Sequence, residues 1–134
     1  MKKELLKKRK RKGFTLVELV VVIAIVAVLS GIAVAAFSQM TKASQEATFR
    51  ANHRTLVSAV MMAYANNNGI KSDTIETDVN NSIVDPQDPN KKGTAALIGN
   101  PKGATYELDK NTGTVTSTWK PQGAEKAIVL TYTP

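Results

Sequence analysis

The sequence predicts an α+β fold, in which a long N-terminal α-helix carries a small antiparallel β-sheet head on its C-terminal half. An uncharged apolar run covers residues 19–37, helical periodicity continues without Gly or Pro between Ala33 and Asn68, and three β-rich runs follow residue 104. We therefore expect four segments: a basic leader (1–13), an apolar helix (14–38), its amphipathic continuation (39–67), and a connecting loop with a three-stranded sheet (68–134).

The leader holds most of the excess charge. The chain has 134 residues with 18 Lys+Arg against 11 Asp+Glu, and eight of those basic residues, opposed by Glu4 alone, lie within residues 1–13. The leader thus carries +7, while ten basic and ten acidic side chains balance in the remainder. A DNA-binding domain would carry its excess positive charge on a folded face, and this chain does not. Since the chain has no cysteine, stability must come from packing or assembly.

The apolar run is long enough to cross a membrane. At ~1.5 Å per residue, residues 19–37 and the apolar positions just before them span a hydrocarbon layer of ~30 Å. The adjacent basic block predicts a single-pass orientation with the N-terminus in the cytoplasm.

A secretory signal peptide is the alternative, since Ala33-Val34-Ala35 offers an A-x-A cleavage site. Its apolar core would exceed the ~7–15 residues typical of signal peptides, and Glu18 would stand near its start. The helical pattern also continues past Ala36. These features favour a helix that is retained.

Residues 13–18 read G-F-T-L-V-E between the basic leader and the apolar run. This order resembles the class III signal of type IV prepilins and pseudopilins, closely over the first 55 residues or so. The resemblance implies the pilin fold, cleavage by a prepilin peptidase between Gly13 and Phe14, and N-methylation of Phe14. It also implies partners: the membrane, a pilus assembly platform with its ATPase system, and other subunits in a helical filament. Gly13 would be a substrate residue, whose missing Cβ lets the backbone enter a close active site.

Glu18 is a carboxylate in an apolar run and needs a partner there. We expect none nearby before cleavage. Cleavage would create the α-amino group of Phe14, four residues away on the same helical face. The resemblance implies that Glu18 meets the Phe14 amino group of a neighbouring subunit and sets register during assembly. A glutamate that reaches the lipid headgroups is the alternative.

Ser30 and Gly31 form the weak point of the apolar helix, since Gly lowers helix stability by ~1 kcal/mol and Ser can bond back to the backbone. Many type IV pilins have a proline where this chain has Ala35. We expect any melting in a filament to centre near Gly31. Close helix contact at Gly31, in a small-residue patch with Ala27 and Ala35, is the other interpretation.

The second half of the helix carries one apolar stripe, which requires a cover. The stripe comprises Phe49, His53, Leu56, Val60 and Tyr64, and is widened by Val57, Ala59, Met61 and Ala63. The cluster at 66–69 predicts the helix end. His53 is expected at the edge of the core rather than on a metal, and Met61-Met62 as core filling.

The remaining residues predict the head. Residues 70–103 indicate a long connection with a short helix or turn near 94–98, and Asp85, Asp88 and Asn90 indicate turns rather than a calcium site. Runs at 105–109, 114–119 and 127–133 alternate apolar and polar residues. They predict a three-stranded antiparallel sheet on the stripe. Trp119 is expected at the core edge, with a subunit contact or ligand stacking as the alternative.

The sequence shows no constellation for catalysis, so we expect neither an enzyme nor a cofactor or metal site. The favoured function is a structural filament subunit of a type IV pilus or related pseudopilus, first in the cytoplasmic membrane and then at the cell surface. A membrane-anchored binding module that does not polymerise is the alternative. Nucleic acid would be a partner only of a DNA-uptake filament, through local patches such as Lys91-Lys92 or Lys102.

Overall fold

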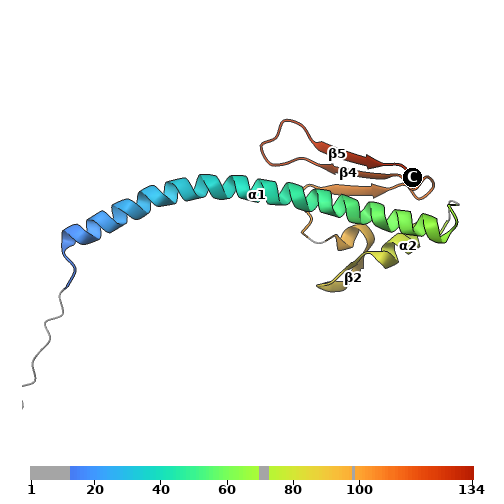
Figure 1. Ribbon diagram of the computed structural model, residues 1–134, viewed down its shortest axis with the longest axis horizontal. Coiled ribbons are helices and arrows are strands. Elements are labelled where there is room, and N and C mark those ends of the chain that lie inside the picture. The colour runs from blue at the N-terminus through green and yellow to red at the C-terminus, as the bar shows by residue number, and fades with distance from the viewer. Residues whose placement is uncertain (1–12, 70–72, 98) are drawn as a thin grey trace, which may run out of the picture. The chain divides into compact units, whose positions relative to one another are not determined.

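The computed structural model describes residues 13–69, 73–97 and 99–134. The expected leader, apart from Gly13, lies outside the described residues. The chain divides into two compact units, the first ending at Ser38 and the second running Gln39–Pro134. Helix α1 (Leu16–Asn66) contributes to both (Figure 1). The expected α+β architecture is confirmed.

Helix α1 starts two residues later than expected, at Leu16 rather than Phe14, because Thr15 caps it. It ends in the asparagine cluster as predicted. Asn68 and Gly69 adopt φ of 54° and 75°, a left-handed conformation that glycine reaches at no steric cost. The Gly69 N–H donates to the Tyr64 carbonyl at 2.7 Å and closes the last turn.

The predicted three-stranded sheet is present in the second unit. Its strands are β3 (Thr105–Leu108), β4 (Val115–Trp119) and β5 (Ile128–Tyr132), each within one residue of the expected bounds at either end. The order is β3-β4-β5, with both pairs antiparallel. Thr105 lies opposite Thr118, and Trp119 lies opposite Ile128. The starts of β3 and β5 therefore lie at one end of the sheet with the end of β4.

The sheet covers the apolar stripe of α1. Phe49, Leu56 and Val60 are fully buried, and the Phe49 ring packs on Trp119 and Tyr106 at centroid distances of 5.7 and 5.9 Å. Side-chain hydrogen bonds tie α1 to this part of the head: Asn52 to Tyr106, His53 to Ser117, and Tyr64 to the Thr112 carbonyl. Trp119 is 2% exposed and packs on Phe49 outside the main core cluster, in line with the expected place at the core edge.

The connection before the sheet is more structured than the sequence predicted. It contains α2 (Ile75–Ser82), a hairpin of β1 (Val84–Asp85) and β2 (Asp88–Lys92), and the 3-10 helix η1 (Gly93–Ala96). The expected short helix or turn near 94–98 overlaps η1. Only two apolar residues, Ile75 and Val79, mark α2 in the sequence, and both are buried in the core. Tertiary burial thus makes this helix where the local pattern was too sparse.

The expectation that Met61 and Met62 fill the core was wrong. Their side chains are 50% and 58% exposed, although Ala63 next to them is buried. The sheet covers a narrower arc of α1 than the widened stripe, so both methionines remain at the surface.

Candidate processing and assembly site

The segment 13–18 includes the last residue of the leader and the first three residues of α1, and every residue in it is exposed. Gly13, Phe14 and Thr15 precede the first helical residue, and the Phe14 ring is 91% exposed. A Cβ at Gly13 would meet nothing within 4 Å, so no contact within the chain requires glycine there. The residues around the expected cleavage point thus lie outside regular structure and are accessible.

Thr15 and Glu18 form a reciprocal pair at the start of α1. Glu18 Oε2 accepts from the Thr15 backbone N–H at 2.8 Å and from its hydroxyl at 3.0 Å. In return, the Glu18 N–H donates to Thr15 Oγ1 at 3.2 Å. This is a capping box, in which the first and fourth residues satisfy donors that the helix leaves unpaired.

The capping box corrects one expectation. Glu18 was expected to have no partner before cleavage, yet its carboxylate binds Thr15 of its own chain. The signal was in the sequence, because T-x-x-E ahead of an apolar run is the pattern of a capping box. Glu18 is therefore held beside the backbone of Thr15, one residue from the amino group that cleavage would create on Phe14.

The first unit leaves its apolar side chains uncovered. Helix α1 is long and apolar enough to cross a membrane, and its most apolar 18-residue window has a mean hydropathy of 3.0, with none of it buried in the chain. The bulky apolar side chains between Leu16 and Phe37 are all between 49% and 78% exposed. A core helix of a soluble domain would be largely buried, so this surface needs lipid or another protein.

The expected weak point is helical in the isolated chain. Ser30 Oγ donates to the Val26 carbonyl at 2.7 Å, which is the back-bonding that the sequence suggested. α1 is unbroken through Gly31, and a Cβ there would meet nothing within 4 Å. The role of Ser30 and Gly31 in a filament stays a prediction.

His53 lies where α1 meets β4. Its Nδ1 is 2.8 Å from the hydroxyl of Ser117, a fully buried side chain on β4. Partial burial lowers the pKa of His53, because desolvation disfavours the charged imidazole. This is a contact of the helix–sheet interface, in line with the expected place at the core edge.

Asp85 and Asp88 serve turns, as predicted. Asp85 Oδ1 accepts from the Gln87 N–H at 2.8 Å, and Asp88 Oδ1 accepts from the Asn90 N–H at 3.2 Å. Within the described ranges, no three His, Cys, Asp or Glu side chains gather as metal ligands.

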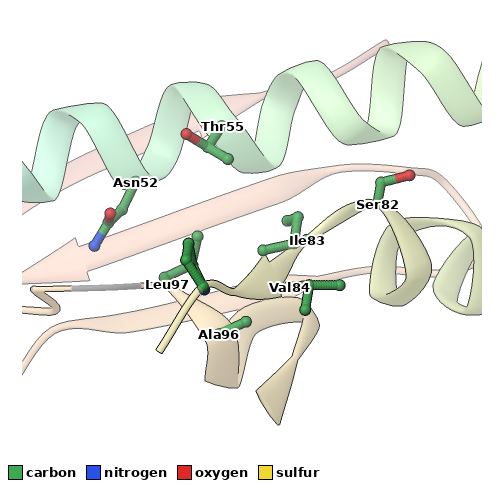
Figure 2. A pocket seen from close by; sticks show the side chains of 8 residues that line it. Asn52, Thr55, Ser82, Ile83, Val84, Ala96 and Leu97 are labelled. Atoms are coloured by element: carbon green, nitrogen blue, oxygen red, sulfur yellow. The ribbon is translucent and has the colours of Figure 1, made fainter. Parts of the chain in front are cut away.

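A groove of about 290 Å³ runs between α1 and the segment from Ser82 to Leu97 (Figure 2). Figure 2 shows Asn52 and Thr55 on the helix facing Ile83, Ala96 and Leu97. Asn52 already donates to Tyr106 Oη, and Thr55 donates to the Ala51 carbonyl. With its polar groups paired and no ionisable side chain in its lining, this groove offers nothing for acid–base chemistry.

Comparison with known proteins identifies the N-terminal segment. Residues 8–34 match the family model for the prokaryotic N-terminal methylation motif. The match spans the end of the leader, the segment 13–18 and most of the apolar run, which is about a fifth of the chain. No solved structure matches the chain.

Proposed function

We propose that this chain, which carries at residues 8–34 the class III signal peptide of type IV pilin-like proteins, is a structural subunit of a type IV pilus or related pseudopilus. The chain enters the cytoplasmic membrane as a prepilin with its N-terminus inside. A prepilin peptidase then cleaves after Gly13, and Phe14 is N-methylated. The assembly platform, driven by its ATPase, adds the mature subunit to a helical filament at the cell surface. The motif family is structural rather than enzymatic.

The exposed apolar half of α1 carries this proposal. A filament subunit needs one surface that is stable in lipid before assembly and against other helices afterwards. The first unit has this surface, because its Val, Ile, Leu and Ala side chains are exposed and the described residues do not cover them. Helix packing then replaces the lipid contacts that are lost on extraction.

Glu18 supports register in the filament. The capping box holds its carboxylate at the start of α1, where lipid headgroups and water reach it in the membrane. In a filament, the charged amino group of a neighbouring Phe14 would replace that solvent. A pair of opposite charges ~4 Å apart attracts by several kcal/mol at intermediate dielectric, before desolvation is subtracted. Such a pair selects a register, while apolar packing supplies most of the stability.

The test is N-terminal sequencing and mass measurement of the extracellular form of the full chain. We expect sheared filaments whose subunits begin at Phe14 and carry one added methyl group. A start near Ala36 or Phe37 would show cleavage by signal peptidase and overturn the proposal. A chain that starts at Phe14 but stays monomeric in the membrane fraction would instead indicate the anchored binding module.

A further inference from the structure

We propose that the two ends of the head carry opposite charge so that the lysine-rich end of one subunit binds the acidic end of the next copy. The lysine end comprises the loops before β3 and between β4 and β5. The acidic end comprises the end of β3 from Glu107, the β3–β4 turn, and the first half of α2 with Asp73 before it. The inference rests on the proposed filament and names the surfaces through which heads meet.

The lysine end lies beside Gln45 of α1. Lys102 and Lys120 line a hollow of about 340 Å³ together with Gln45, Trp119 and Gln122. Lys126 follows in the β4–β5 loop, where Glu125 is the one acidic residue. All three lysines are exposed, and none pairs with an acid within the part of the chain that the structure describes. Three lysines against one glutamate give this end a net +2.

The acidic end lies at the other end of the sheet. The hydrogen bond from Tyr64 Oη to the Thr112 carbonyl places the β3–β4 turn beside the last turns of α1. The contact between Lys110 Nζ and Glu76 Oε2, at 3.9 Å, brings the start of α2 to the same place. Five acids and Lys110 give the described residues here a net −4; the acids are Asp73, Glu76, Asp78, Glu107 and Asp109.

Glu107 is the acid best placed for a partner. It is exposed on β3 and lines a hollow with Asp109, Thr114 and Thr116 on the outer face of the sheet. No described residue forms an ion pair with it. Asp109, in contrast, accepts from the Asn111 and Thr112 N–H groups and holds the turn.

Filament symmetry brings unlike ends together. Copies related by a screw operation meet through two different surfaces, whereas a two-fold dimer would place like surfaces, and here like charges, against each other. Opposite charges at the two ends favour the first arrangement and disfavour the second. The charged side chains of the described head residues form a dipole, while the formal charges in the sequence of the head sum to about zero. The attraction between two heads therefore depends on their relative orientation and not on their net charge.

The experiment compares charge reversals in the full chain, expressed in a cell with the prepilin peptidase and the assembly machinery. The variants are Lys120→Glu, Glu107→Lys and the double variant. Lys92→Glu on the exposed end of β2 is the control, since it makes the same charge change at a residue that belongs to neither end. Membrane level and circular dichroism before assembly check that each variant is folded.

We expect each single reversal to lower the yield of sheared filaments by roughly tenfold, and the double variant to recover to within about twofold of wild type. Lys92→Glu should assemble normally. Wild-type filaments should also shorten between about 0.1 and about 1 M salt, where the screening length falls from ~10 to ~3 Å. If wild-type filaments form and each single charge reversal leaves their yield unchanged, this inference is overturned while the proposed function stands. Processed chains that never form filaments would overturn the proposed function and this inference with it.

Discussion

Glu18 caps α1 and is also the residue to which we assign the register of the proposed filament. Its carboxylate accepts two hydrogen bonds from Thr15, so the isolated chain already satisfies it. In the proposed filament, a contact with a neighbouring Phe14 would therefore compete with, or add to, an existing cap. A carboxylate has lone pairs for both, because its two oxygens offer about four acceptor sites.

Substitutions of Glu18 separate its role as a helix cap from the role of its negative charge. We expect Glu18→Ala to leave cleavage and membrane insertion intact, while filament yield falls roughly tenfold or more because the Phe14 ammonium loses its buried partner. Glu18→Gln keeps an acceptor for Thr15 but removes the charge. If pairing governs assembly, Gln fails like Ala. Normal filaments from Glu18→Gln would leave the cap as the only role of this residue, as measured by electron microscopy of sheared fractions.

At the scale of elements, the two halves of the continuous helix α1 have different environments. Its first half exposes its apolar side chains, and its second half buries Phe49, Leu56 and Val60 under the head. The interface between α1 and β4 also contains a titratable contact, His53 to Ser117. Since the pKa of His53 is lowered by burial, the folded head binds a proton less readily than the unfolded chain.

The stability of the head should therefore depend on pH. Where the unfolded state binds more protons, stability rises with pH, so the contribution of neutral His53 is fully present above the unfolded pKa of about 6.5. It is lost as the pH falls through that value toward the lower pKa of the folded state. We expect the thermal midpoint of the full chain in detergent to fall between about pH 7.5 and 5. His53→Asn, which can still reach Ser117, should fall less. Identical pH profiles would rule out His53 as the source.

For the whole molecule, the proposed cleavage after Gly13 would change the net charge. The intact chain has a pI near 9.7, and its net +7 resides in the first 13 residues. Removal of that segment leaves ten basic and ten acidic side chains. Under the proposed function, the leader would be an orientation and processing signal, and the remaining charge would act through its distribution over the head.

Isoelectric focusing of the extracellular form should reveal which cut was made. Cleavage after Gly13 predicts a pI near neutrality, because the side chains sum to zero. Cleavage after Ala35 would also remove Glu18 and leave ten basic against nine acidic residues, a net +1. A band at the basic pI of the precursor would mean that the leader is retained and would contradict processing.

The sequence by itself determined the features that depend on local pattern: the apolar run, the asparagine cluster that ends α1, and the three alternating strands. Even the Thr15–Glu18 cap was readable there, although it was missed. Tertiary structure decided the rest. Helix α2 forms because the core buries Ile75 and Val79, and the methionines stay exposed because the sheet covers a narrow arc. The opposite charges of the two ends become visible only when strand register places distant loops together. Periodicity reports which face of one element is apolar, whereas only packing reports which faces meet.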